Sequence, residues 1–343
     1  MSKVYDIAIL GASGYTGAEL VRIISSHPQM NIKSMSAERK AGQTMGNVFP
    51  HLRHLDLPEL QKIEAIDLEN VDLVFAALPH GVTHGLAKEL PASTKLVDLS
   101  ADFRLSDPEV YKYWYGLDHT AMELQPKVAF GLPEFYRSEI AEAQITANTG
   151  CYVATSLLPL VPAVKAGVIA SEDIVIDAKS GVSGAGRAPK ENLLFTEVSG
   201  GFQAYGVGHH RHMAELDQEL SKAAGKKVTP TFTPHLLPQA RGIEATIYVK
   251  GEASEIHTIL SKHFAAERFV EVLPFGDIPA TQHVRGSNMC HIGVKADRLP
   301  GWSIILSVTD NLVKGASGMA VQNANLMLGL PEAMGLEMAP LFP

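Results

Sequence analysis

One of the two cysteines sits where a reactive thiol would be expected. The stretch ITANTGCYVATSLLPLV places Cys151 between a short β-like run and a long apolar run that predicts a helix. A thiol has a pKa of about 8.5, and the positive end of a helix lowers it by stabilising the thiolate. Asn148 and Thr149 are residue types that cap helix N-termini, and the Cys151 N–H is a candidate donor to an oxyanion. The stretch predicts a nucleophilic cysteine, with a buried small hydrophobe as the alternative.

Two prolines follow that cysteine within the predicted helix. Pro159 and Pro162 each lack a backbone N–H, so we expect the helix to kink or end early with its first turns intact. The other cysteine, Cys290, lies in the alternating run NMCHIGVK, which predicts strand core and no role in chemistry. Two isolated cysteines suit neither a disulfide framework nor a cysteine-based zinc site.

A dense histidine cluster offers the imidazole that a thiol enzyme needs. The stretch FQAYGVGHHRHMAELDQEL brings together His209, His210, Arg211, His212 and Glu215 at the start of a helical pattern. Imidazole exchanges protons near neutral pH, which makes this cluster the candidate acid/base. A zinc site and a plain polar loop are the alternatives, and we predict no metal.

A glycine-rich loop lies between the cysteine and the histidines. The stretch DAKSGVSGAGRAPK is rich in small residues whose backbone N–H groups suit an anionic or amide group. Its candidate residues are Ser180, Gly181, Ser183, Gly184, Gly186 and Arg187. A plain glycine turn is the alternative interpretation.

A second glycine-rich turn follows the first predicted strand. Residues 6–10 run into GASGYTG and then into a helical pattern, an arrangement that brings backbone N–H groups and a helix dipole against a pyrophosphate. The GxxGxxG spacing is weaker as a motif than GxGxxG, but its position after the first strand is the required one. The predicted cofactor-binding residues are Gly11, Ser13, Gly14, Tyr15, Thr16 and Gly17. An ordinary βα turn is the alternative.

The residues after the second predicted strand indicate which nicotinamide cofactor binds. NAD-specific sites usually carry an acidic residue there, to hold the ribose hydroxyls. Here KSMSAERKAG places Ser34 and Ser36 at that point, with Arg39 and Lys40 just beyond. Basic side chains suit a 2′-phosphate, so we expect NADP, although Glu38 keeps a solvated turn open as an alternative.

The order of predicted elements indicates an α/β fold with two domains. Short apolar β runs alternate with helical patterns over the first hundred residues, which is typical of a parallel Rossmann-type sheet covered by helices. Longer β runs follow from about residue 170 and predict a second, α+β domain with a mostly antiparallel sheet. We expect a dinucleotide domain over 1–150, completed by a C-terminal helix over 316–343, and a catalytic and dimerisation domain over 151–315. Cys151 then falls at the domain boundary, where ligand sites concentrate.

Composition excludes several classes of function. The 343 residues carry a formal charge of −8 without a run of five or more basic residues, which argues against a nucleic-acid or anionic-membrane surface. No stretch of eighteen uninterrupted apolar residues predicts a membrane span, and the start MSKVYDIAILGASG resembles a strand and turn rather than a cleavable signal. We therefore expect a cytoplasmic, globular protein.

Taken together, the motifs resemble one family over nearly the whole chain. GASGYTGAELVRII, ALPHG, LSADFRL, FGLPE, ANTGCYVATSLLPL, KSGVSGAGR, HHRHMAEL, PHLLPQARGI and DNLVKGASGMAVQNANLMLGL are similar, in this order, to N-acetyl-gamma-glutamyl-phosphate reductase, a relative of aspartate-semialdehyde dehydrogenase. The resemblance implies NADPH-dependent reduction of N-acetylglutamyl phosphate through a cysteine thioester, with release of phosphate, in arginine biosynthesis. It also implies a homodimer or homotetramer.

The resemblance also implies roles for individual residues. Cys151 is the nucleophile, and His212 is the acid/base, with His210 as the runner-up. Arg104 matches the family's phosphate-holding position, and Glu215 either orients the histidine or receives the substrate amide. Further candidates for the substrate are Asn148, Arg187, Arg241 and Arg285, and further candidates beside the cofactor are His80, Ser183, Gly184, Asn311 and Lys314.

Rival functions remain open at this point. The nearest are an aspartate-semialdehyde dehydrogenase and a carrier-protein-linked acyl-phosphate reductase of the lysine or arginine pathways. The motifs HRHMAEL and LSADFRL argue against the first of these. A thiol hydrolase or acyltransferase would need no dinucleotide, and a sensor of NADP redox state would not need the cysteine.

Overall fold

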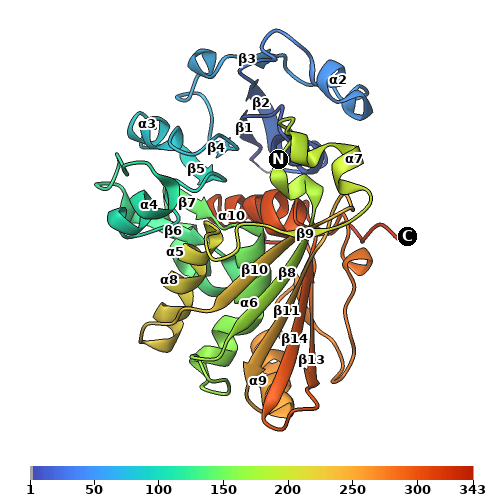
Figure 1. The fold of residues 1–343 in the computed structure, drawn as a ribbon. Helices are drawn as coiled ribbons and strands as arrows, with labels where there is room; N and C mark the ends of the chain where they lie inside the picture. The colour runs from blue at the N-terminus through green and yellow to red at the C-terminus, as the bar shows by residue number, and fades with distance from the viewer. Residues whose placement is uncertain (1–2, 343) are drawn as a thin grey trace. The chain divides into compact units, whose positions relative to one another are not determined.

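The chain folds into two compact units. The computed structural model describes residues 3–342. The first unit joins Met1–Thr149 to Ala316–Glu337, and the second consists of Gly150–Gly315 with Met338–Pro343. Within the described residues each unit is built on a seven-stranded sheet, which is parallel in the first unit and mixed, mostly antiparallel, in the second (Figure 1). The predicted fold class is confirmed.

The first unit is a doubly wound parallel sheet. Its strands lie in the order β3-β2-β1-β4-β5-β7-β6, and every pairing between them is parallel. A run such as LVFA, fully buried, is typical of a strand covered on both faces. The bounds are β1 Tyr5–Leu10, β2 Met30–Ser36, β3 Leu60–Gln61, β4 Leu73–Ala76, β5 Lys95–Asp98, β6 Val128–Gly131 and β7 Ile145–Asn148.

Helices connect these strands and complete the first unit. They are α1 Tyr15–Ile24, α2 Met45–Val48, α3 Thr83–Lys88, α4 Pro108–Tyr115, α5 Pro133–Glu142 and α10 Gly318–Met327. The last of these is much shorter than the helix predicted over 316–343. It ends because Gly329 adopts φ +68 and Pro331 lacks an N–H. Residue 343 lies outside the described residues.

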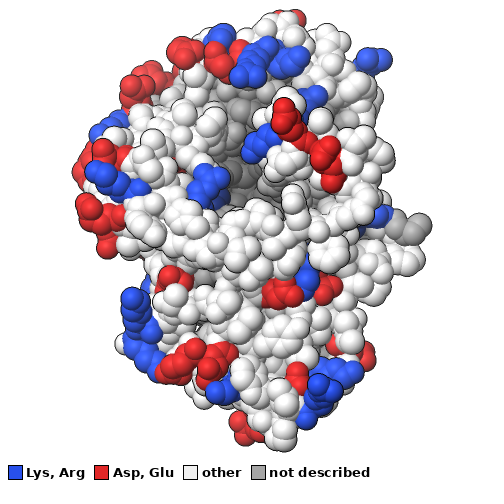
Figure 2. All heavy atoms as spheres, in the orientation of Figure 1, with Lys and Arg blue, Asp and Glu red and all other residues white. Residues whose placement is uncertain are grey.

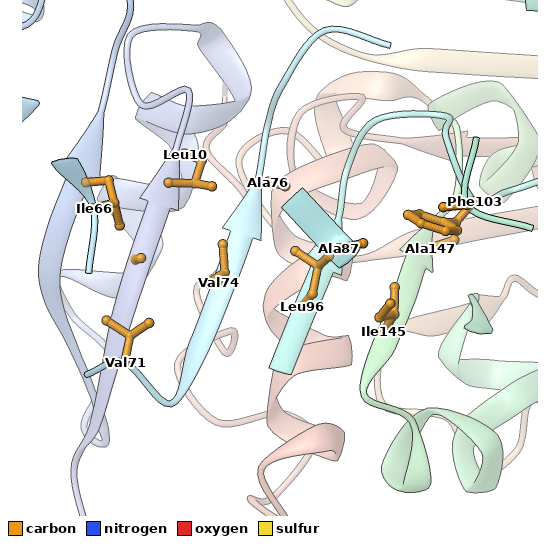
Figure 3. Close-up of a cluster of buried hydrophobic side chains, with 12 residues drawn as sticks. Leu10, Ile66, Val71, Val74, Ala76, Ala87, Leu96, Phe103, Ile145 and Ala147 are labelled. Carbon is orange, nitrogen blue, oxygen red and sulfur yellow. The ribbon is translucent and has the colours of Figure 1, made fainter. Parts of the chain in front are cut away.

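A buried apolar cluster fixes the first unit's strands side by side. Leu10, Val74, Leu96 and Ile145 come from β1, β4, β5 and β7 and are at most 3% exposed (Figure 3). Because all strands are parallel, their carboxyl ends meet at one edge of the sheet. The loops that follow these strands are therefore held close together.

The second unit is a mixed sheet packed against long helices. Its strands lie in the order β12-β13-β14-β11-β8-β10-β9, with parallel pairing only for β8 with β10 and β12 with β13 among the pairs in the described residues. Alternate residues of β11 are buried, as expected for a sheet with one covered face. The bounds are β8 Val175–Gly181, β9 Gln203–Ala204, β10 Thr231–Leu237, β11 Ile243–Lys250, β12 Val270–Val272, β13 Cys290–Ala296 and β14 Trp302–Thr309.

The helices of the second unit include the one that begins at the cysteine. They are α6 Cys151–Lys165, α7 Phe195–Val198, α8 His212–Ala224 and α9 Ala253–His263. A π-helix over Val313–Ser317 begins in this unit and ends in the first unit, which resumes at Ala316. Of the two expected outcomes, a kink or an early end, the early end is wrong, because α6 continues past Pro159 and Pro162. Twelve of its residues are buried, and this packing outweighs the two lost backbone hydrogen bonds.

Charged side chains are mixed over the surface. Figure 2 shows basic and acidic groups of the described residues interspersed on the face drawn, as the small net charge suggests. Among residues 3–342, no helix is both long and apolar enough to cross a membrane.

Candidate active site

The turn after β1 requires glycine at two positions. Gly11 has φ +84, and a Cβ built there would lie 2.2 Å from the carbonyl oxygen of Ala77. A Cβ on Gly17 would lie 2.4 Å from the carbonyl oxygen of Gly11, so α1 packs directly on the turn. Helix α1 begins after Gly14 without a side-chain cap. Its first N–H groups and its dipole therefore suit an anionic ligand such as a pyrophosphate.

Ser36 supports this turn from within. Its hydroxyl oxygen accepts a hydrogen bond from Gly11 N–H at 3.2 Å, and its carbonyl accepts one from Ala12 N–H at 2.8 Å. The side chain is 3% exposed. Ser36, which stands where a cofactor ligand is predicted, thus has a structural role in the turn, and its binding of the cofactor stays a prediction.

The exposed turn after β2 is more basic than its sequence suggests. Glu38 forms an ion pair with Lys62, which comes from the segment after β3. Its negative charge is thereby balanced, and Arg39 and Lys40 are exposed beside it. This balance removes the main argument against a site for a 2′-phosphate.

Two loops at the edge of the first sheet hold each other. Nδ1 of His80 accepts a hydrogen bond from Ala101 N–H at 3.1 Å. The buried carboxylate of Asp102 accepts hydrogen bonds from Gly81 N–H at 2.7 Å and Thr83 N–H at 2.9 Å. The first bond leaves Nε2 as the protonated nitrogen of a neutral His80 ring. The ring is therefore held in one orientation.

Arg104 lies beside two buried carboxyl groups. Its Nη2 donates to the carbonyl of Leu99 at 3.0 Å, and the side chain is 8% exposed. Burial, and then the charge of Asp102, raise the pKa of Asp98 to about 6, while Arg104 acts in the opposite direction. The guanidinium is thus fixed in place at the end of β5, partly balanced by acidic groups.

Asn148 is engaged within the first unit. Its Nδ2 donates to the carbonyl of Ala316 at 3.2 Å, and its Oδ1 accepts from Asn323 at 3.0 Å. Only 1% of the residue is exposed. We therefore do not retain Asn148 as a substrate ligand, and the same residue does not cap α6.

Cys151 is the first residue of α6 in the second unit. The N-cap is Gly150, with φ −70 and ψ 152, and no side chain caps this end, so the expected capping by Asn148 or Thr149 is wrong. Cys151 is partly exposed and is not in a disulfide. Its N–H belongs to the first turn, outside the intrahelical ladder, where it can meet an oxyanion. A Cβ on Gly315 would lie 2.8 Å from Cβ of Cys151, so the π-helix after β14 packs against it.

Helix α8 is docked on this helix end through two side chains. A Cβ on Gly150 would lie 2.3 Å from Nε2 of His212, so the imidazole lies directly against the residue before Cys151. One turn along α8, the buried carboxylate of Glu215 accepts a hydrogen bond from Gly150 N–H at 3.2 Å. The sequence-predicted nucleophile and histidine are brought together at one end of α6. Glu215 binds backbone there, which argues against a role in receiving the substrate amide.

His210 is a poor proton carrier in this setting. Burial, and then the charge of Arg211, lower its pKa to about 4. Its Nδ1 accepts a hydrogen bond from His212 N–H at 3.2 Å. The His210 ring is neutral at neutral pH, and its Nδ1 is occupied by the hydrogen bond from His212. His210 therefore supports the position of His212 and does not act as an acid.

The glycine loop after β8 is tied to the loop after β10. Asn311 accepts from Gly242 N–H at 2.8 Å and donates to the hydroxyl of Ser183 at 2.9 Å. Asn311 is 2% exposed. The predicted cofactor contacts of Ser183 and Asn311 are therefore not supported, because their side chains bind each other. Gly184 is exposed on the same loop, and Lys314 is wholly buried above the ring of Phe269.

The candidate arginines of the second unit differ in environment. Nη1 of Arg241 lies 3.6 Å from the fully buried carboxylate of Asp310. Arg187 is exposed just after Gly186, and Arg285 is half-buried. Within the described residues no group of three or more His, Cys, Asp or Glu side chains is arranged to hold a metal ion.

Sequence reasoning missed two residues beside the thiol in the second unit and one residue that supports the His80 loop in the first unit. Tyr152 and Tyr205 border the histidine pair, and Asp102 binds two N–H groups of the His80 loop. An aromatic residue directly after the nucleophile was a usable signal for Tyr152. Tyr205 and Asp102 are brought in by tertiary folding, and no local pattern marks them.

Comparison with known proteins agrees with this arrangement. Residues 6–143 match the family model described as semialdehyde dehydrogenase, NAD binding domain, and residues 151–311 match semialdehyde dehydrogenase, dimerisation domain. Aspartate semialdehyde dehydrogenase II of Vibrio cholerae, complexed with ASA, has a TM-score of 0.72 at 18% identity, covering 96% of this chain and 99% of that one. The enzyme of Candida albicans with NADP has a TM-score of 0.70 at 16% identity, covering 95% and 99%. Fold and site thus define a protein of the semialdehyde dehydrogenase class.

Relatives in sequence narrow this class. N-acetyl-gamma-glutamyl-phosphate reductase of Cereibacter sphaeroides is 57% identical over 341 residues, covering 99% of this chain and 100% of the relative. That of Ruegeria pomeroyi is 58% identical over 340 residues, covering 99% of both. The chain belongs to the N-acetyl-gamma-glutamyl-phosphate reductase family, and the resemblance found in its motifs is confirmed.

Proposed function

We propose that the chain reduces N-acetyl-L-glutamyl 5-phosphate to N-acetyl-L-glutamate 5-semialdehyde with NADPH, reversibly and with release of phosphate, as a step of arginine biosynthesis. The observation that carries this proposal is the docking of His212 and Glu215 on Gly150, directly before a cysteine at a helix N-terminus. Membership of the reductase family supports the choice of substrate.

The first step forms a thioester on the enzyme. His212 takes the thiol proton of Cys151, and the dipole of α6 stabilises the thiolate. The sulfur attacks the acyl-phosphate carbonyl, so that a carbon–sulfur bond forms. The oxyanion is met by the Cys151 N–H, and the carbon–oxygen bond to phosphate then breaks. Phosphate leaves, and the acyl group remains on the sulfur.

The second step releases the semialdehyde. When bound, the reduced nicotinamide of NADPH would supply the hydride that reduces the thioester carbon. His212 steadies the oxygen of the resulting thiohemiacetal, and the carbon–sulfur bond breaks to give the aldehyde and the Cys151 thiolate. His212 is assigned this role because the low pKa of His210, about 4, leaves that ring neutral.

The first unit would hold NADP at its glycine turn. The close packing of Gly11 and Gly17 leaves backbone N–H groups at the start of α1 for the pyrophosphate, near Ser13, Tyr15 and Thr16. Arg39 and Lys40 would bind the 2′-phosphate, and His80 would lie beside the cofactor. The match to an NAD binding domain supports this assignment.

Arginines would hold the anionic groups of the substrate. Arg104, fixed at the end of β5, is assigned the phosphate. Arg187 and Arg241 are the candidates for the carboxylate, because a planar guanidinium pairs with a carboxylate through two hydrogen bonds. Asp310 already balances part of the charge of Arg241.

The reverse reaction tests the proposed function. We expect phosphate-dependent reduction of NADP⁺ with N-acetylglutamate semialdehyde and little turnover of aspartate semialdehyde. The absorbance of the NADPH formed measures both rates. Equal or faster turnover of aspartate semialdehyde would overturn the substrate assignment. Repeated turnover without phosphate would overturn the transfer of the acyl group to phosphate, because water would then cleave the thioester.

A pair of variants tests the acid/base assignment. We expect His212→Asn to lower kcat by about 10²- to 10⁴-fold, as for loss of a general acid/base. His210→Asn keeps an acceptor for His212 N–H, so its kcat should stay within about tenfold of wild type. The reversed order of effects would assign the proton transfer to His210.

The second unit would form a homodimer through the half-exposed face of its sheet. This face carries Tyr248, Trp302, Ile304 and Leu306, and the match to a dimerisation domain supports its use. Sedimentation should give the mass of two chains for wild type and of one for the double variant Ile304→Glu, Leu306→Glu, with exposed Leu299→Glu as control. Four chains would indicate a second interface.

A thiol that has to stay reduced supports a cytoplasmic location.

A further inference from the structure

Two tyrosine hydroxyls lie behind the histidine pair and have no part in the steps above. Tyr152 follows Cys151 in the first turn of α6 and is 2% exposed. Its hydroxyl donates to the carbonyl of His235 on β10 at 3.1 Å and accepts from the hydroxyl of Tyr205 at 3.2 Å. The residue next to the nucleophile is thus anchored to the sheet through a directed chain of two hydroxyls.

The same two rings enclose His210. Tyr152 and Tyr205 meet its ring edge to face, with centroids 5.8 Å and 5.4 Å away, and Phe232 closes a third side at 5.5 Å. Such contacts fix the orientation of a ring in a close-packed interior. His210 therefore has little freedom to move.

His210 in turn fixes the start of α8. Its Nδ1 accepts from the N–H of His212, two residues further on, as an asparagine side chain does in an Asx-turn. The two imidazoles are 4.8 Å apart, and Tyr152 also touches the ring of His212 with centroids 5.9 Å apart. The position of His212 against Gly150 thus depends on the rings behind it.

We propose that Tyr152 and Tyr205 are positioning residues of the reaction, which act through His210 to hold the His212 imidazole at the end of α6 beside Cys151. Neither residue is the nucleophile or the acid/base of the steps above. Burial raises the pKa of Tyr205 to about 12 and also raises that of Tyr152, so both hydroxyls keep their protons and the chain keeps its direction. This inference rests on the proposed function only for the identity of the reaction.

Tyrosine-to-phenylalanine variants remove the hydroxyls and keep the rings. We expect Tyr152→Phe to lower kcat about tenfold, with KM changed less than about twofold, because the imidazole is displaced relative to the thiol. Tyr205→Phe should lower kcat by about threefold. The double variant should be no worse than Tyr152→Phe alone, because both hydroxyls act through one chain. Tyr113→Phe, with its side chain 70% exposed in the first unit, is the matched control.

Alkylation of the thiol gives a readout that needs neither substrate nor cofactor. The rate of Cys151 inactivation by iodoacetamide at neutral pH should fall severalfold in Tyr152→Phe, and its pH profile should shift, since the neighbouring imidazole sets the thiolate fraction. Unchanged kcat and alkylation profiles would overturn the proposal, even with a lowered melting temperature. Additive losses in the double variant would also overturn it. If Tyr152→Phe fails to fold, Tyr205→Phe decides by the same two readouts.

The alkylation experiment separates this inference from the proposed function. A wild type that does not turn over N-acetylglutamate semialdehyde refutes the proposed function, while the alkylation profiles of the variants still report whether the hydroxyls position His212. A wild type that turns over the substrate, with variants identical to it in both readouts, refutes only the inference.

Discussion

The glycine turn of the first unit and the thiol site of the second are built in opposite ways. The turn is made of backbone from one continuous stretch, and its requirements are steric, as the 2.4 Å approach at Gly17 illustrates. The thiol site takes side chains from α6, from α8 and from the loop before α8. Gly150 and His210, which lie at the centre of this site, are sixty residues apart in sequence. A local motif predicts the first kind of site, whereas the second depends on packing between distant helices.

The two sites also treat charge differently. In the first unit the basic groups beside the turn are exposed, and Lys62 balances Glu38 at the surface. In the second unit His210 and His212 are half-buried, and the wholly buried Glu215 accepts a hydrogen bond from the N–H of Gly150. Substitutions in the second site should therefore cost more than those at the surface of the first.

The largest effect is expected at the nucleophile. Cys151→Ser should lower kcat by about 10⁴-fold or more, because a serine hydroxyl is a far weaker nucleophile than a thiolate. Cys290→Ser is the matched control, since Cys290 is buried in β13 with its Sγ 3.4 Å from the hydroxyl of Ser307. Turnover by Cys151→Ser close to that of wild type would remove the chemical basis of the thiol site.

The second prediction concerns the stability of the thiol site in acid. His210 has a pKa of about 4 in the folded chain against an ordinary value of 6.5, so the unfolded chain binds its proton first as the pH falls. The contribution of His210 to the free energy of unfolding is complete above pH 6.5. About 2–3 kcal/mol of this free energy is lost as the pH falls from 6.5 to 4. His210→Asn should flatten this part of the profile.

Tryptophan fluorescence makes that test specific to the second unit. The chain has two tryptophans, Trp114 in the first unit and Trp302 in the second. Urea unfolding in a Trp114→Phe background therefore reports the second unit, with His209→Asn as the exposed control. Equal acid sensitivity in His210→Asn and wild type would show that His210 is not the group responsible.

The third prediction tests the steric origin of the first site. Gly17→Ala should destabilise the first unit by about 2 kcal/mol, because its Cβ would meet the backbone of Gly11 and Ala12. Gly14→Ala is the matched control: its φ is −82 and its Cβ would lie 3.6 Å from the nearest atom, so a loss under about 1 kcal/mol is expected. Urea unfolding followed by Trp114 measures both, and equal losses would contradict the packing argument.

The same contrast explains what the sequence could and could not predict. The parallel sheet, the glycine turn and the start of a helix at Cys151 follow from local patterns, and each is present. The roles of Ser36 and Asn311 were missed because their hydrogen-bond partners, Gly11 and Gly242, are far away along the chain. Residue type alone cannot tell a polar side chain that binds a ligand from one that holds two loops together.

The smallest effect is expected at the exposed edge of the first site. Arg39→Ala should raise KM for NADPH by about tenfold and leave KM for NADH unchanged, because only NADPH carries the 2′-phosphate. Lys33→Ala is the matched control, since that exposed cation of β2 pairs with Asp6 near the start of β1 and has no part in the proposed site. Steady-state kinetics with both cofactors measure this. A similar rise of KM for both cofactors would mean that Arg39 supports the turn and does not bind the 2′-phosphate. The exposed edge of the first site would then resemble the thiol site of the second unit, where side chains act by holding other side chains in place.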